Sequence, residues 1–179
     1  MSYIRYVIGV DPSGSFNEGK GTTGIAVYDI KKDKIVEIRT VCATKYNCLE
    51  QYIDANWQVL NELCSDYTST KERAMVCIED FLVYAANATA FTHSKMETCQ
   101  LLGHLKTQMW RWEIPYLIEP ASAVKTRWSN DILVYKGYVE QKGKSYYHPC
   151  IRGPLATHML DAIRHAVHCG KFGVTSYET

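Results

Sequence analysis

The sequence predicts an α/β fold with one mixed β-sheet, in which three antiparallel strands precede parallel strands and helices flank the sheet. Three runs rich in Val and Ile lie near the N-terminus, separated by short turns that contain Gly or Lys and Asp. After the third run, helical and strand-like segments alternate, which is the order typical of parallel strands covered by helices.

Length and composition indicate a globular protein without a membrane span. The 179 residues are most simply one domain covering 1–179, long enough to bury a sizeable core. No stretch approaches the ~20 consecutive apolar residues of a membrane helix, and the N-terminal segment lacks the apolar region of a signal peptide. We therefore expect a cytoplasmic protein whose seven cysteines, none in C-x-x-C spacing, are reduced thiols.

The first strands are expected at 7–11, 24–28 and 35–41, as an antiparallel meander. Asp11 closes the first of them and leads into a Gly/Ser loop. A carboxylate at a strand tip beside an open loop is well placed as a metal ligand and costly as a core residue.

The middle of the chain predicts a helix, a strand, a long helix and a further strand. Apolar residues spaced by three and four mark an amphipathic helix over 49–64. The short apolar run 75–79 has the length of a buried strand and ends at Glu79. A long helix is expected from about Asn87 to Trp112, ended by Pro115 and followed by a strand at 116–118.

The last third begins with a short helix opened by Pro120 and containing Lys125, and it ends with a helix over 158–168. The stretch 130–155 shows no clear periodicity. Six basic and two acidic residues lie between positions 125 and 152, with aromatic residues between them. Such a segment neutralises phosphates and packs against sugars or bases, or else it is an ordinary solvated loop. Its candidate DNA-binding residues are Lys125, Arg127, Lys142 and Lys144.

Three carboxylates from separate segments form a candidate metal site: Asp11, Glu79 and Asp161. Mg²⁺, with Mn²⁺ as a substitute, prefers such oxygen ligands. Two ions about 4 Å apart activate water on one side of a phosphodiester and stabilise the leaving oxygen on the other. His158 precedes Asp161 by three residues, so a helix places both side chains on one face. His158 is a candidate metal ligand or proton carrier, or else a residue that faces solvent.

Other polar residues near the predicted site have less definite roles. Lys125 either holds a phosphate there or caps its helix. His165 and His168 are interpreted as structural or surface residues.

Four motifs, in order, resemble those of RuvC-type Holliday junction resolvases, which have the ribonuclease H-like fold. The first is Ile8-Gly-Val-Asp11-Pro-Ser-Gly with Thr23-Gly-Ile-Ala-Val, and the second is Val76-Cys-Ile-Glu79 with Ala86-Asn-Ala. The third is Pro120-x-x-x-Val124-Lys125, which has one residue more than the family pattern, and the fourth is His158-x-x-Asp161-Ala. The resemblance covers nearly the whole chain.

The resemblance implies a Mg²⁺-dependent endonuclease that acts as a homodimer and nicks two strands of a four-way DNA junction symmetrically. Carried over position by position, Asp11, Glu79, His158 and Asp161 are its metal-binding and catalytic set. The compact, divergent sequence is similar to bacteriophage members of the family, which would place the protein in a host cytoplasm.

Besides the extra residue in the third motif, the chain departs from the family pattern in three places. The loop between Asp11 and Gly24 is longer and contains Glu18 and Lys20. Leu82 stands where the family often has an aromatic wedge, so Phe81 or Tyr84 is the candidate for opening the junction. The family's Gly-rich, Lys-containing segment before the last helix is not recognisable between positions 130 and 154.

Three other functions compete with a resolvase. A related nuclease of the same fold, acting on flaps, other branched DNA or RNA, would keep the carboxylates without the dimer. Actin- and Hsp70-like ATPases share a similar first motif but need two such domains. A non-catalytic binding module is disfavoured because clustered carboxylates repel one another when no metal is bound.

Overall fold

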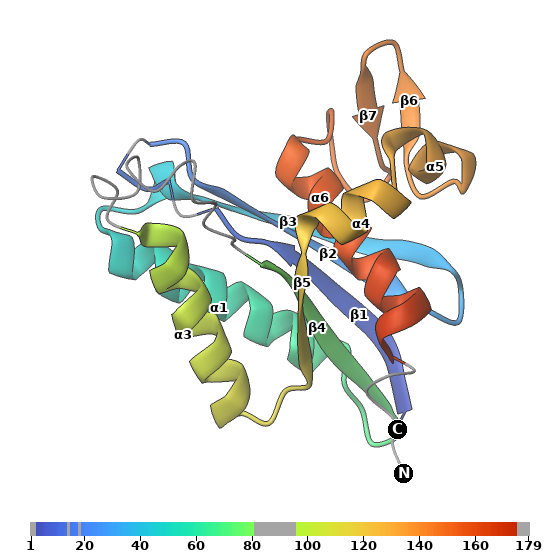
Figure 1. Cartoon of the computed structure of the whole chain (residues 1–179). Helices are drawn as coiled ribbons and strands as arrows, with labels where there is room; N and C mark the ends of the chain where they lie inside the picture. The colour runs from blue at the N-terminus through green and yellow to red at the C-terminus, as the bar shows by residue number, and fades with distance from the viewer. Residues whose placement is uncertain (1–2, 14, 18, 81–95, 175–179) are drawn as a thin grey trace.

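A computed structural model describes residues 3–13, 15–17, 19–80 and 96–174. Its main feature is a five-stranded sheet in the order β3-β2-β1-β4-β5 (Figure 1). The strands are β1 (Tyr3–Asp11), β2 (Thr22–Asp29), β3 (Lys34–Cys42), β4 (Glu72–Asp80) and β5 (Tyr116–Pro120). The first three strands pair antiparallel, whereas β4 and β5 run parallel to β1. The mixed sheet predicted from the sequence is confirmed.

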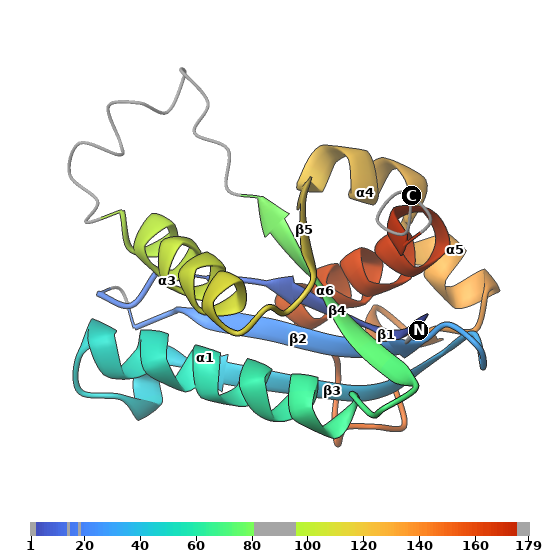
Figure 2. The ribbon, with the colours of Figure 1, turned by 90° about the horizontal axis from the view of Figure 1, so that it is seen from below.

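Helices cover both faces of the sheet (Figures 1 and 2). One face carries α1 (Leu49–Asp66) and α3 (Glu97–Arg111), which also contact each other. The other face carries α6 (Thr157–His168), continued by a single π-helical segment η3 (Cys169–Gly173), with α4 (Ala121–Arg127) beside it. A short 3₁₀ helix, η1 (Ala43–Lys45), follows β3. Among the described residues, no helix has the length and apolarity that a membrane span requires.

The helix expected from about Asn87 does not run unbroken to Trp112. Met96 has a φ angle of +49°, which is outside the helical range, and the helix begins at the next residue. Residues 87–95 lie outside the described residues. The predicted end of the helix agrees with the structure, since α3 ends at Arg111.

The stretch without clear periodicity contains regular structure after all. It folds as a short helix α5 (Asn130–Tyr135) and a hairpin of β6 (Glu140–Lys142) and β7 (Ser145–Tyr147). These elements are too short to produce a repeating apolar pattern, and local chemistry defines them instead. The Ser129 hydroxyl caps α5 by accepting from the Ile132 amide at 3.3 Å, and Gly143 supplies the positive φ of the hairpin turn.

Two glycines allow α6 to lie directly on the sheet. A Cβ atom on Gly9 of β1 would stand 2.1 Å from the Ala162 carbonyl oxygen. A Cβ atom on Gly24 of β2 would stand 2.1 Å from the carbonyl oxygen of His158. Because only glycine tolerates so close an approach, these positions determine how near the first turns of α6 come to the ends of β1 and β2.

Candidate active site

The three predicted carboxylates converge between the sheet and α6. Val10 pairs with Ile78 in the parallel β1–β4 ladder, so Asp11 and Glu79 lie side by side at the C-terminal ends of their strands. Asp161 reaches them from the second turn of α6. One carboxylate oxygen from each of the three residues lies within 4.8 Å of the other two. The side chains are only 10%, 15% and 5% exposed, in chain order, so water screens their mutual repulsion poorly.

The environment affects the pKa of these carboxyl groups in opposite directions. Burial raises the pKa of Asp11, and the charges of Glu79 and Asp161 raise it further, although the hydrogen bond with His158 opposes them. Burial also favours the neutral form of Glu79, but His165 and Lys125 outweigh it and lower the pKa of that group. A bound cation would relieve the repulsion that Asp11 experiences.

Lys125 points into the carboxylate group rather than only capping its helix. Its Nζ atom lies 3.0 Å from Asp161 Oδ2 and 3.4 Å from Glu79 Oε1. Burial opposes the charged form, but the hydrogen bond to Asp161 and the carboxylate charges raise the pKa of Lys125 above its ordinary value. The side chain is 43% exposed, so this cation is accessible from solvent.

His158 lies against Asp11, as its spacing from Asp161 permits. The Nδ1 atom of His158 is 2.8 Å from Asp11 Oδ2. This hydrogen bond, opposed by burial, raises the pKa of His158 above its ordinary value of 6.5. The imidazole is 37% exposed and can therefore exchange a proton both with the carboxylate and with solvent.

The His158–Asp11 contact predicts a pH dependence of stability in metal-free protein. Because the pKa of His158 is raised by folding, its contribution is complete below pH 6.5 and is lost as the pH rises through the folded-state pKa. We expect the free energy of unfolding to fall over that interval, and to fall less in His158→Gln. Urea titrations at a series of pH values in the presence of a chelator measure both slopes; equal slopes would contradict the prediction.

Arg164 is a site residue that the sequence analysis missed. Its guanidinium contacts Asp161 Oδ1 and Asn130 Oδ1, and Nε donates to the Trp128 carbonyl at 2.8 Å. This anchored cation holds one oxygen of Asp161 and leaves the other beside Lys125. The available signal was the spacing of three residues between Asp161 and Arg164 on one helix.

His165 was interpreted as a structural or surface residue, and the surface alternative is wrong. Its side chain is fully buried, and Nε2 lies 3.2 Å from Glu79 Oε2. His168, one turn further along α6, accepts a hydrogen bond at Nδ1 from the Trp128 indole at 3.2 Å. Its side chain is 14% exposed. The spacing of His165 four residues after Asp161 is the pattern that would have placed it on the site face.

The predicted DNA-binding residues occupy exposed positions. Arg127 stacks over the Phe172 ring at 4.3 Å, and Lys142 lies over Tyr147 at 5.4 Å and pairs with Glu140 at 3.3 Å. Lys144 lies exposed on the β6–β7 hairpin, which projects beyond the sheet (Figure 1). The predicted wedge candidates Phe81 and Tyr84 lie outside the described residues.

Two aromatic residues of the basic segment belong to the core. Trp128 and Tyr138 are 6% and 2% exposed and pack with the buried face of α6. They are therefore unable to stack on sugars or bases, which corrects that part of the prediction. Tyr135, at 85% exposed, remains accessible.

The long loop after Asp11 is fixed to the helices on the opposite face of the sheet. Glu97, at the start of α3, accepts hydrogen bonds from the backbone amides of Phe16 at 2.7 Å and Asn17 at 3.3 Å. The Tyr52 hydroxyl of α1 donates to the Ser13 carbonyl at 2.6 Å. Hydrogen bonds from α1 and α3 thus fix this longer loop, which begins directly after Asp11.

Comparison with known proteins identifies the fold. No family model matches the chain, and no curated protein matches it. Two solved structures of RuvC from Thermus thermophilus are similar, each with a TM-score of 0.65. One, in complex with a Holliday junction substrate, is 13% identical, and the match covers 97% of this chain and 95% of that chain. The other is 14% identical and covers 96% of each chain. The chain therefore has the fold of RuvC.

Proposed function

We propose that this protein is a metal-dependent endonuclease that resolves branched DNA, chiefly four-way junctions, by paired nicks. The observation that carries the proposal is the convergence of Asp11, Glu79 and Asp161, within 4.8 Å, on a RuvC fold. One of the similar RuvC structures contains a Holliday junction substrate, which supports the same class of substrate for this chain.

The donor atoms of the site fit a hard divalent cation. Asp11, Glu79 and Asp161 offer carboxylate oxygens, the ligands that Mg²⁺ and Mn²⁺ prefer, and we assign His158 to the same set. Burial, and then the charges of Glu79 and Asp161, raise the pKa of Asp11, and a bound cation would favour its charged form. Two ions per site, when bound, would supply activation of water and stabilisation of the leaving oxygen.

The side chains of the protein contribute positioning, charge and proton transfer. His158, held on Asp11 and partly exposed, is placed to take up or release a proton at Nδ1. Lys125 is an accessible cation beside two carboxylates and would bind a phosphate oxygen of the substrate. Arg164 and His165 are positioning residues, since each holds one oxygen of a carboxylate in place.

Binding of the DNA is assigned to exposed cations on the α6 side of the sheet. Arg127, Lys142 and Lys144 would contact phosphates, with Lys125 at the reacting strand. Leu155, two residues before α6, bonds through its amide to the Tyr146 carbonyl at 2.7 Å, which ties the hairpin to the start of the site helix. Paired nicks on two strands require two active sites, so we propose a homodimer, with Phe81 or Tyr84 opening the junction.

The double variant Lys142→Ala/Lys144→Ala is expected to weaken junction binding for all sequences alike. Each lost phosphate contact should reduce the slope of log K against log salt by about 1. Binding titrations at several salt concentrations measure this slope. Lys106→Ala, an exposed lysine on α3, is the matched control and should leave the slope unchanged. An unchanged slope in the double variant would show that the hairpin lysines do not contact DNA phosphates.

The function is tested by cleavage of a labelled immobile four-way junction in Mg²⁺, beside a matched duplex, a flap and an RNA–DNA hybrid. Paired symmetric nicks confined to the junction are the expected result. Cutting of the flap or the hybrid in preference to the junction would identify a related nuclease with the same metal site. No cleavage of any substrate in Mg²⁺ or Mn²⁺ would refute the nuclease assignment.

A further inference from the structure

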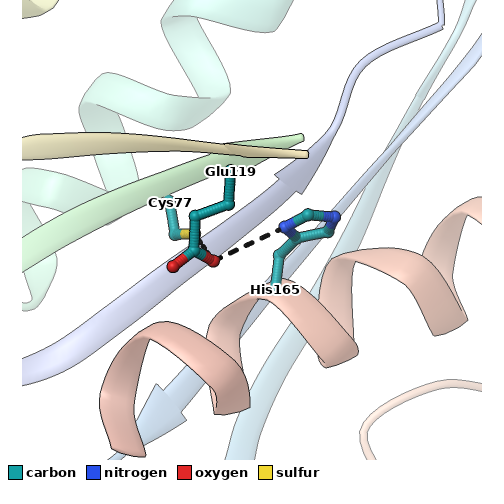
Figure 3. A group of neighbouring side chains, drawn as sticks. All are labelled: Cys77, Glu119 and His165. Carbon is teal, nitrogen blue, oxygen red and sulfur yellow. Dashed lines mark hydrogen bonds and ion pairs between the residues drawn. The ribbon is translucent and has the colours of Figure 1, made fainter. Parts of the chain in front are cut away.

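A second group of metal-ligating side chains lies next to the carboxylates but is not part of them. Cys77 comes from β4, Glu119 from β5 and His165 from α6, and the three side chains point toward one another (Figure 3). The Cys77 thiol donates to Glu119 Oε2 at 3.1 Å, and His165 Nδ1 lies 3.9 Å from the same oxygen. Sulfur, nitrogen and oxygen donors within 4.8 Å of one another form a softer ligand set than the three carboxylates.

The spacing of these atoms suits a tetrahedral ion. Zinc binds sulfur at about 2.3 Å and nitrogen or carboxylate oxygen at about 2.0–2.2 Å, which places neighbouring ligand atoms roughly 3.3–3.8 Å apart. The observed separations of 3.1 and 3.9 Å lie close to these values. Cys169 of η3 is buried in the same apolar cluster as Cys77, so its thiol is the protein group available as a fourth ligand.

His165 gives an independent indication that a ligand belongs here. Its side chain is fully buried, and Nδ1 has no hydrogen-bond partner among the described residues. Its distance to Glu119 is too long for a hydrogen bond. Buried polar atoms are rarely left without a partner, and this one is directed at a thiol and a carboxylate.

We propose that Cys77, Glu119 and His165 bind one zinc-class ion, with Cys169 or water completing the coordination. Binding exchanges the Cys77 thiol proton, released to solvent, for a metal–sulfur bond. With Nδ1 bound to the ion, His165 carries its remaining proton on Nε2. This N–H donates a hydrogen bond to Glu79 Oε2. Metal-bound histidines commonly hold a carboxylate in this way. The ion therefore acts as a structural support for the candidate active site, and His165 is a positioning residue for Glu79.

Cobalt substitution tests the site independently of DNA cleavage. A cobalt–thiolate bond gives a charge-transfer absorption that a site made only of carboxylates cannot give. The full-length protein is stripped of metal with a chelator and titrated with Co²⁺. We expect the band to appear at one equivalent, to be lost in Cys77→Ser, and to be displaced by added Zn²⁺.

Two variants separate this site from other sources of the same signal. Asp11→Asn removes a carboxylate of the candidate active site and should retain the band. Cys150→Ser removes the thiol of an exposed cysteine, whose backbone amide donates to His148 Nδ1, and should also retain it. Metal analysis of protein purified without chelator should find one zinc per chain in wild type and none in Glu119→Gln, which keeps the test available if Cys77→Ser does not fold.

Absence of the band in folded wild-type protein would overturn the proposal, as would a band that persists in Cys77→Ser. Loss of the band in Asp11→Asn would also overturn it, because the ion would then belong to the carboxylate site. Cleavage of junction DNA in Mg²⁺ is measured separately, so failure of the zinc site leaves the proposed nuclease function standing.

Discussion

Asp11→Asn is expected to reduce junction cleavage by about 10³-fold or more while leaving junction binding intact. The substitution keeps the size of the side chain but removes one of three charges that would hold the metal. Metal ions contribute several kcal/mol to transition-state stabilisation, and each 1.36 kcal/mol corresponds to about a tenfold change in rate. Binding should be preserved or tightened, because a negative charge is removed beside the phosphates. Single-turnover cleavage and equilibrium binding, measured on the same junction, give the two quantities.

Asp54→Asn is the matched control for this experiment. Asp54 is exposed on α1, which covers the face of the sheet opposite α6, and its loss should affect neither quantity. Loss of binding together with cleavage in Asp11→Asn would contradict a role confined to the metal site. Full cleavage in that variant would exclude Asp11 from catalysis altogether.

That the carboxylates meet could be predicted from the sequence, because residues at the ends of neighbouring parallel strands lie close together. Asp11 and Glu79 each close an apolar run, and parallel neighbours in a sheet end at the same edge. Asp161 required only that the last helix pack back on the sheet. The proximity of these three residues could therefore be predicted from local patterns, and in the structure one carboxylate oxygen of each lies within 4.8 Å of the other two.

The residues that support the carboxylates could not be predicted in the same way. Arg164, His165 and Glu119 act through contacts between elements far apart in the chain, such as Arg164 with Trp128 and His165 with Glu79. A histidine in a helix has the same appearance in the sequence whether it faces solvent or a buried carboxylate. The short elements between positions 130 and 147 were missed for a different reason, since periodicity is not measurable over three to six residues.

The face of α6 toward the sheet contributes residues to both the proposed nuclease site and the proposed zinc site. His158, Asp161 and His165 lie at spacings of three and four residues along one stripe of the helix. They contact Asp11, the carboxylate group and Glu79 in turn. The distance between α6 and the sheet therefore controls the whole row of contacts, and that distance depends on Gly9 and Gly24.

Gly24→Ala is accordingly expected to destabilise the protein strongly. The new Cβ would stand 2.1 Å from the carbonyl oxygen of His158 and 2.4 Å from its carbonyl carbon. Both atoms belong to the backbone, so no side-chain rotation relieves the contact, and α6 must shift away from β2. We expect a loss of about 3 kcal/mol in the free energy of unfolding, at the upper end for overpacking. At roughly 2–4 °C per kcal/mol for a chain of this size, the Tm should fall by roughly 6–12 °C.

Gly103→Ala distinguishes this contact from a general effect of adding a methyl group. Gly103 is exposed in α3, and a Cβ there meets nothing within 4 Å. Alanine should therefore stabilise the helix by about 0.5–1 kcal/mol. Cleavage by Gly24→Ala, assayed well below its Tm, should still fall by about 10²-fold, because a shift of about 1 Å is enough to misplace reacting groups. If Gly24→Ala matched Gly103→Ala in stability and wild type in cleavage, the seating of α6 on β2 would not govern the site.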